Sequence, residues 1–367
     1  MHPDLLYQIS LTRVPQVGCI HAKILLQTFG TAEAVFRASL PSLERVEGIG
    51  RIRAQSIKTF RDFAKSEKEI HFLERYQIRA LALNDPAYPQ RLLPCYDAPV
   101  LLYYKGNADL NQLKIISVVG TRRFSDYGKQ ITEKLIRDLT AYQVLVVSGL
   151  AFGIDAIAHK TALKQSLQTV GVLAHGLSTL YPPEHLLLSK DIAKHGGLLT
   201  EFLSDCKPDK HNFPIRNRIV AGMSDAVIVT ETGVKGGSMI TADLANGYNK
   251  EVFAFPGRST DLKSAGCHWL IRNHQANLIS SAQDLIQEMG WEKKQAPALE
   301  KQPELFVELS EPEQKILNLL KERESMHIDT INAVTGFTQS LNAATLLSLE
   351  MKEMIQSLPG RIYKSRN

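Results

Sequence analysis

The chain has 367 residues, of which 44% are hydrophobic and 22% charged, with 43 Lys and Arg against 38 Asp and Glu. At about 150 residues per domain this length predicts two or three domains, and the composition excludes a disordered or collagen-like chain. No apolar run reaches the roughly 18–20 residues that span a bilayer, and the opening sequence MHPDLLYQISLTR lacks the pattern of a secretory signal, so we expect a cytoplasmic protein with no membrane partner.

The sequence contains four widely spaced cysteines: Cys19, Cys95, Cys206 and Cys267. None of them forms a CxxC pair, which argues against a zinc ribbon and against a disulfide framework. Free thiols fit a reducing compartment such as the cytoplasm. His175, His185 and His195 recur every ten residues, a spacing that places no two of them on one helix face. We therefore predict no metal site.

The net charge of +5 is a weak indication of a polyanionic partner, and it is unevenly distributed. Residues 1–80 carry +4, residues 81–290 carry +2, residues 291–308 carry −1, and residues 309–367 are neutral. The positive excess therefore lies at the front of the chain.

Residues 1–80 are predicted to form a domain of helices joined by short glycine turns. The stretches 11–22 and 43–54 share one pattern, in which Leu is followed by Val three residues on and by Gly four residues later, before a helix. The pattern predicts a duplicated helical unit.

The second copy, with Gly48 and Gly50 at its turn, resembles a helix–hairpin–helix element. In such turns glycine allows unusual dihedral angles and brings backbone N–H groups close to a DNA phosphate. Arg51 and Arg53 follow the turn, so we predict these four residues as auxiliary DNA contacts. The alternative is that the glycines only close turns between packed helices.

From residue 81 onward, apolar β-branched runs alternate with helical patterns. Continuous apolar runs indicate strands buried on both faces, as in a parallel sheet. The predicted fold class of residues 81–290 is therefore α/β, a doubly wound parallel sheet. The predicted strands are 115–119, 144–147, 169–173, 197–199, 226–229 and 251–255, and the predicted helices are 127–141, 154–166, 183–195, 214–223 and 238–248.

Residues 291–308 are charged, contain two prolines and are predicted to be a linker. Ser310 and Glu313 then form the pattern of a helix N-terminus, with a proline in the first turn. Helices over 311–323, 327–334 and 339–354, followed by a hairpin near 358–363, describe a winged-helix domain at residues 309–367. Its third helix contains no Lys or Arg, so we expect contact with protein rather than tight binding of duplex DNA.

Ligands bind open parallel sheets at the carboxyl ends of the strands, so the loops after the strands are candidate binding segments. Three such loops, 120–128, 148–155 and 230–238, combine glycines with small hydroxyl residues and open into a helix. Bare N–H groups, hydroxyl donors and the positive end of a helix dipole are suited to holding phosphates. Arg122 adds a bidentate cation to the first loop.

A fourth candidate segment places cations and an aromatic ring before a helix: Lys210, Phe213, Arg216, Asn217 and Arg218. A base stacked on an aromatic ring between backbone-binding cations is typical of single-strand binding without base readout. The alternative for Arg216 and Arg218 is a structural pairing with carboxylates such as Glu201 or Glu231.

Several catalytic patterns are missing from the sequence. It has no GxxxxGK[ST] P-loop, no GxGxxG fingerprint and no Asp/Glu/His cluster of the kind found in two-metal nucleases, so we predict no cofactor and no catalytic residue. The alternative is a Rossmann-like nucleotide phosphoribohydrolase-type enzyme that uses Glu231 as its acid/base. Only Gly236–Ser238 echoes the PGGxGTxxE motif of such enzymes.

Six ordered motifs together resemble the DprA/Smf family of DNA-processing proteins. They are SVVGTRRFSDYG (117–128), VVSGLAFGIDAIAH (146–159), FPIRNRIVAGMSDAVIV (213–229), KGGSMITADLA (235–245), FAFPG (253–257) and SAGCHWLI (264–271). The resemblance covers about 200 central residues densely and also accounts for helical and winged-helix flanks.

The resemblance implies a Rossmann-like domain that binds single-stranded DNA, forms a homodimer and loads a RecA-type recombinase during natural transformation. It also implies which residues line the DNA pocket: Gly120, Thr121, Arg122, Ser125, Lys210, Phe213, Arg216, Asn217, Arg218, Gly236, Gly237 and Ser238. The chain departs from the family pattern at Phe152, where many members carry a cation, so the 148–155 loop is left out of the predicted site.

Overall fold

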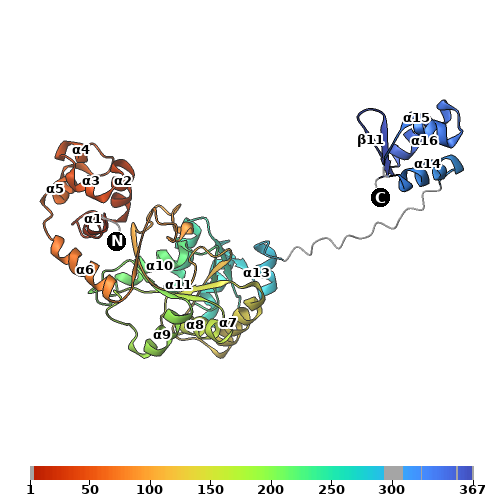
Figure 1. Cartoon of the computed structure of the whole chain (residues 1–367). Helices are drawn as coiled ribbons and strands as arrows, with labels where there is room; N and C mark the ends of the chain where they lie inside the picture. The colour runs from red at the N-terminus through yellow and green to blue at the C-terminus, as the bar shows by residue number, and fades with distance from the viewer. Residues whose placement is uncertain (1–3, 293–308, 324, 353, 366–367) are drawn as a thin grey trace. The chain divides into compact units, whose positions relative to one another are not determined.

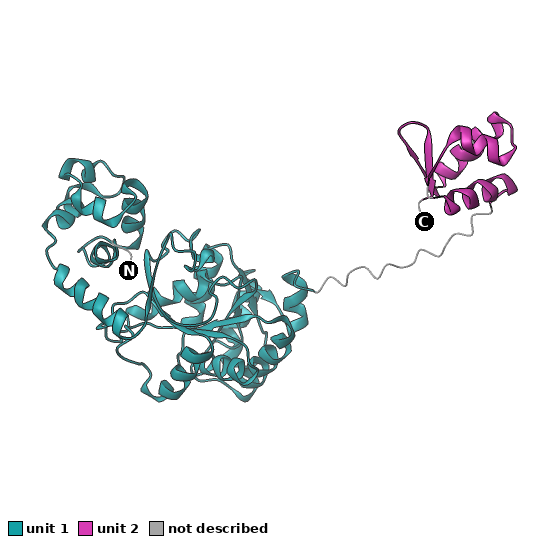
Figure 2. Cartoon of the chain, in the orientation of Figure 1, with its two compact units in different colours: residues 1–292 teal, residues 293–367 magenta. Residues whose placement is uncertain are grey.

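The structure, a computed structural model, describes residues 4–292, 309–323, 325–352 and 354–365. The chain divides into two compact units, residues 1–292 and 293–367 (Figures 1 and 2). The described residues include no helix long and apolar enough to cross a membrane, and no group of three or more metal-ligating side chains.

Residues 4–75 form a cluster of short helices around a hydrophobic core that Val100 also joins. Both copies of the repeated pattern contribute to it: Val14 and Val46 are buried, Gly18 is the N-cap of one helix, and Gly50 is the first residue of another. The predicted helical character of this region is confirmed. The helices are α1 (Leu5–Leu11), α2 (Cys19–Phe29), α3 (Ala32–Arg37), α4 (Leu40–Glu44), α5 (Gly50–Thr59) and α6 (Phe63–Arg75).

The helical cluster and the following sheet pack together within one unit. The Glu69 carboxylate on α6 accepts hydrogen bonds from the backbone N–H and the hydroxyl of Ser204, and Lys23 donates to the carbonyl of Leu93. A shared core joins the two parts as well. The predicted domain boundary at residue 80 stays a prediction, because the residues on both sides of it belong to one compact unit.

A nine-stranded sheet forms the centre of the first unit, in the order β1-β2-β6-β5-β4-β3-β7-β8-β9. The seven strands from β6 to β9 in this order run parallel, whereas β2 is antiparallel to β6 and β1 is antiparallel to β2. The strands are β1 (Arg79–Ala82), β2 (Leu101–Gly106), β3 (Ile115–Val119), β4 (Leu145–Ser148), β5 (Thr169–Val172), β6 (Gly197–Thr200), β7 (Ala226–Val229), β8 (Glu251–Ala254) and β9 (Asn277–Leu278).

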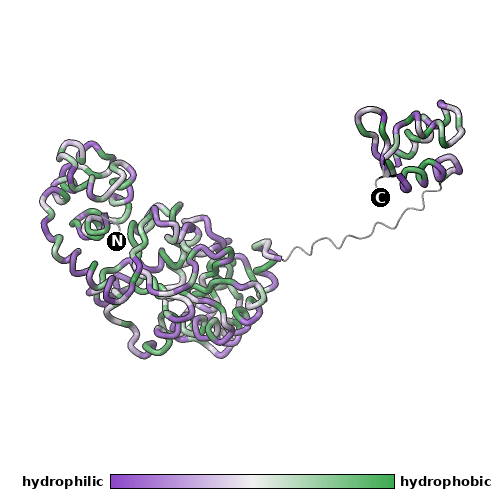
Figure 3. Tube along the Cα trace, viewed as in Figure 1, coloured by the Kyte–Doolittle hydropathy of each residue, from purple (hydrophilic) through white to green (hydrophobic). Residues whose placement is uncertain are grey.

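Both faces of the parallel sheet are covered, as the continuous apolar runs predict. Ile115 and Val119 of β3 belong to one core, which includes residues of α10, α11 and α12, and Ile116 and Val118 belong to the opposite core with residues of α7, α8 and α13. Figure 3 shows the hydropathy of the described residues along the Cα trace. The helices are α7 (Asp126–Asp138), α8 (Ile154–Lys164), α9 (Leu186–His195), α10 (Asn212–Gly222), α11 (Gly237–Gly247), α12 (Ala265–Arg272) and α13 (Ala282–Glu288), with 3-10 turns η1 (Gln90–Leu92), η2 (Leu139–Tyr142), η3 (Pro183–His185) and η4 (Leu262–Ser264).

The second unit has the winged-helix arrangement that the sequence predicts. Ser310 and Glu313 form the expected capping box, and Glu313 also accepts hydrogen bonds from Ser348 and Lys352. This unit has a core of its own. Its elements are α14 (Glu311–Glu322), β10 (Ser325–His327), α15 (Ile328–Thr335), α16 (Gln339–Met351), β11 (Ile355–Leu358) and β12 (Ile362–Ser365), with a sheet in the order β10-β12-β11. The predicted linker 291–308 lies outside the described residues from position 293.

Candidate nucleic-acid interface

A pocket of the first unit opens at the carboxyl ends of β3, β4 and β7. The chain goes from β3 to β4 on one side and later returns to pair β7 on the other side of β3. This is the topological switch point, where the loops of an open parallel sheet diverge and leave a crevice. The pocket has a volume of about 830 Å³.

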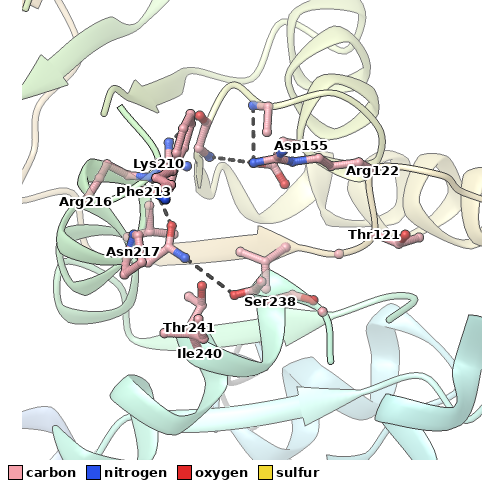
Figure 4. A pocket seen from close by; sticks show the side chains of 18 of the residues that line it. Thr121, Arg122, Asp155, Lys210, Phe213, Arg216, Asn217, Ser238, Ile240 and Thr241 are labelled. Atoms are coloured by element: carbon pink, nitrogen blue, oxygen red, sulfur yellow. Dashed lines mark hydrogen bonds between the residues drawn. The ribbon is translucent and has the colours of Figure 1, made fainter. Parts of the chain in front are cut away.

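Ten of the twelve residues predicted from the resemblance line this pocket (Figure 4). They come from the loop after β3, from the start of α10 and from the start of α11. The sequence motifs, which are up to about 120 residues apart, therefore meet at one place. The ten are Gly120, Thr121, Arg122, Lys210, Phe213, Arg216, Asn217, Gly236, Gly237 and Ser238.

Glycine allows the loops of the pocket to approach each other closely. Gly153 has a φ of +86°, and a Cβ built on it would lie 2.2 Å from the carbonyl oxygen of Thr121. The N–H of Ile154 donates to the same oxygen at 3.2 Å. Only a residue without a side chain permits this contact, so Gly153 fixes the position of the loop that carries Arg122.

A cation and two aromatic rings lie together on one side of the pocket. The guanidinium of Arg122 lies 5.3 Å from the centre of the Phe213 ring, and the Tyr181 and Phe213 rings meet edge to face with centroids 5.8 Å apart. Arg122 and Lys210 are exposed, and Tyr181 is 41% exposed. The arrangement offers an aromatic surface and exposed cations to a ligand.

Tyr181 was not among the predicted site residues. It lies in the segment between β5 and α9, which is another connection leaving the carboxyl end of a strand. The rule that ligands bind at the carboxyl ends of parallel strands, which selected the other loops, would also have selected this segment. The pocket also contains Asp155, Asp209, Ile240 and Thr241, which the predictions omit.

The loop after β4 does not offer its backbone donors to a phosphate. The carboxylate of Asp155 accepts hydrogen bonds from the N–H groups of Gly149 and Ala151, at 3.1 and 3.4 Å. An internal anion thus occupies the position that the glycine-rich pattern suggests for a ligand anion. Burial raises the pKa of Asp155, while nearby Arg216 and the N–H donors favour its charged form.

Arg216 lines the pocket but is bound from within the protein. It is buried, and its guanidinium donates to the carbonyls of Gly149 and Val172, while its Nε donates to Asn217. Burial lowers the pKa of Arg216 to about 10, so it remains protonated at neutral pH. Arg216 therefore ties α10 to the ends of β4 and β5 and adds positive charge to the pocket floor.

Ser125 and Arg218 do not line the pocket. Ser125 caps α7, and both its N–H and its hydroxyl donate to Glu231. Arg218 is buried, forms an ion pair with Glu201 and donates to the carbonyl of Asp97. The sequence left a structural ion pair between Arg218 and Glu201 open as an alternative, and the structure contains this ion pair. DNA contact by these two residues stays a prediction.

The residues of the helix–hairpin–helix turn have mixed roles in the helical cluster. Gly48 and Gly50 both have positive φ angles, of 78° and 56°. Arg53 donates to the carbonyls of Gln16 and Gly48, so it joins the two copies of the repeated pattern. Arg51 is exposed. The structure thus gives Arg53 a packing role, and DNA contact by this turn stays a prediction.

Fold and site together define a Rossmann-like protein with a pocket of cations and aromatic rings at its topological switch point. The model of the family described as DNA recombination-mediator protein A matches residues 79–290. Models of a helix-hairpin-helix motif and of a DprA winged helix domain match residues 10–70 and 297–361. The chain belongs to the DprA/Smf family of DNA processing proteins.

Similar proteins support this assignment over the whole chain. Protein Smf of Synechocystis is 33% identical over 98% of both chains. The X-ray structure of DNA processing protein A from Streptococcus pneumoniae covers 77% of this chain and 97% of its own, at 33% identity and a TM-score of 0.68. A Helicobacter pylori relative, described for its single-stranded DNA binding mode, covers 59% of this chain and 96% of its own, at 33% identity and a TM-score of 0.53.

Proposed function

We propose that the pocket at the carboxyl ends of β3, β4 and β7 binds single-stranded DNA. The observation that carries the proposal is the cluster of Arg122, Phe213 and Tyr181, in which a cation capable of pairing with phosphate lies against rings capable of stacking a base. The Helicobacter pylori relative supports the same ligand.

The geometry favours a single strand over a duplex. The rings of Tyr181 and Phe213 line a recessed pocket rather than a convex surface. A base reaches such rings with its flat face only when it is unpaired and unstacked from its neighbours. In a duplex both faces of each base are already stacked, so the rings have no face to bind.

We further propose that the protein is a recombination mediator and not an enzyme. It would work in the cytoplasm as a homodimer that loads a RecA-type recombinase onto the bound strand, as the resemblance implies. Glu231, the acid/base of the alternative phosphoribohydrolase, is 1% exposed, binds Ser125 and is not among the pocket residues. This geometry gives the alternative no support.

The test of DNA binding reverses the charge of Arg122. Arg122→Glu should weaken binding of a labelled oligothymidylate on the order of 10- to 100-fold, because it replaces a charge-assisted phosphate contact by repulsion. Fluorescence anisotropy at several salt concentrations measures both the affinity and the slope of log K against log salt, which should lose about 0.7.

Arg137→Glu is the matched control, because Arg137 is exposed on α7 and is not a pocket residue. This variant should bind the oligonucleotide like the original chain. A duplex of the same sequence should bind more weakly than the single strand. Equal losses in both variants, or no loss in either, would mean that the pocket is not the binding site.

A further inference from the structure

One exposed aromatic ring beside the pocket has no role in the function proposed so far. Phe152 lies in the loop between β4 and α8 and is 40% exposed. A small hollow next to the main pocket is lined by Phe152 together with Arg122, Tyr181 and Phe213. Phe152 therefore borders the same surface as the cation and the two rings that carry the proposed DNA contact.

The ring of Phe152 is held in place by a buried histidine. Its centroid lies 5.1 Å from that of the His185 ring, with the planes tilted by 64°. His185 is 6% exposed, and its Nδ1 lies 3.0 Å from the carbonyl oxygen of Leu150 in the same loop. The contact fixes the ring without covering it, so part of the ring remains available to a ligand.

The loop that carries Phe152 is unsuited to binding a phosphate. Asp155 accepts hydrogen bonds from the N–H groups of Gly149 and Ala151, and the segment 149–153 contains no Lys or Arg. What this loop presents to solvent beside the pocket is an apolar ring. Its chemistry fits the face of a base and not the backbone of a nucleic acid.

We propose that Phe152 is a second stacking position, which takes a base of the single strand where the strand leaves the main pocket over the 149–153 loop. The hollow between the rings has a volume of only about 10 Å³, so the base lies over the exposed ring and not inside the hollow. The inference rests on the proposed function and adds a base contact to it.

The test compares Phe152→Ala, Phe152→Leu and Phe152→Tyr in the full chain, with oligothymidylate as the probe. Stacking is worth about 1–3 kcal/mol per base, so Phe152→Ala and Phe152→Leu should each weaken binding by between about 5-fold and 150-fold. Phe152→Tyr keeps an aromatic face and should bind nearly as well as the original chain. The salt slope should not change in any of them, because no phosphate contact is lost.

Leu187→Ala is the control for loss of exposed apolar surface, because Leu187 is 74% exposed, aliphatic and two residues from His185. It should leave the affinity unchanged. If the original chain does not bind the oligonucleotide, the proposed function fails. If it binds but Phe152→Ala or Phe152→Leu binds equally well, the stacking position is wrong while the proposed function stands. The stacking position is also wrong if Leu187→Ala loses as much affinity as Phe152→Ala. In that case the surface around Phe152 and Leu187 would bind DNA as a general apolar surface and not by stacking.

Discussion

At the scale of single residues, close backbone contacts decide where the functional side chains lie. Gly153 allows the loop after β4 to approach Thr121, and Gly128 lies against the carboxylate of Glu231, which in turn binds Ser125. Neither glycine lines the pocket. Gly153 fixes the position of the loop that carries Arg122.

Gly153→Ala should therefore damage both stability and binding. Its φ of +86° and ψ of −131° belong to a region that residues with a side chain rarely adopt, and the new Cβ would lie 2.2 Å from a backbone oxygen. We expect a loss of at least about 1–3 kcal/mol in the free energy of unfolding. Urea unfolding followed by tryptophan fluorescence measures it, because both tryptophans, Trp269 and Trp291, lie in the first unit.

Gly247→Ala is the matched control, since Gly247 has open space around its Cβ position and a φ outside the left-handed region. It should leave the unfolding curve unchanged or shift it slightly toward stability. If Gly153→Ala were equally harmless, the tight approach of the two loops would not be what holds the pocket in shape.

Residue types in a local pattern predicted much of the site, but side chains that act across the fold were harder to predict. Arg122 and Phe213 stand in recognisable motifs, and both line the pocket. Arg218 also belongs to a recognisable motif. Its side chain, however, forms an ion pair with Glu201, 17 residues earlier in the chain, and does not line the pocket. Asp155 was missed as the internal anion of its loop because that role depends on how the loop folds back on the helix.

At the scale of elements, the strands buried on both faces were the easiest to predict. The run 226–229 is apolar throughout, and the run 115–119 is apolar except for Ser117. The strands β7 and β3 occupy the same residues. In contrast, β1 and β9 lie at the two edges of the sheet and have only four and two residues, so they show little pattern of their own. Their pairing is decided by neighbours that are distant in sequence.

Glu313 gives the winged-helix unit a stability that depends on pH. Hydrogen bonds from Lys352 and Ser348 lower the pKa of Glu313 to about 2, below the ordinary value of about 4.3. A carboxyl with a lowered pKa stabilises the fold fully above its unfolded value, and the contribution is lost as the pH falls from about 4 toward 2.

Glu313→Gln should therefore lower the Tm of this unit by about 4–8 °C at pH 7, the shift expected for 1 kcal/mol in a domain of this size. The difference between variant and original chain should shrink as the pH falls from 5 to 3. Calorimetry of the full chain measures this Tm. The unfolding transition of the winged-helix unit is the one that is absent from a chain ending at Glu292. Equal melting temperatures at pH 7 would contradict the role given to Glu313.

At the scale of the whole molecule, the part of the chain with the largest positive surplus is not the part that contains the proposed DNA site. The front of the chain carries most of the surplus, and the winged-helix unit is neutral. The proposed site lies in the part with a modest surplus of +2, where the folding of a parallel sheet brings a few cations to one edge. In the proposed site, the positions that the fold gives to the cations therefore matter more than the net charge of the segment.

The most direct test is to locate the strand by photo-crosslinking. A single-stranded oligonucleotide carrying 5-iodouracil is bound to the full chain, irradiated, and the attached peptides are identified by mass spectrometry. Because a base that stacks on an aromatic ring lies close enough to crosslink to it, we expect attachment at Phe213 or Tyr181. Crosslinks confined to residues 309–365 or to the helices before residue 76 would contradict it.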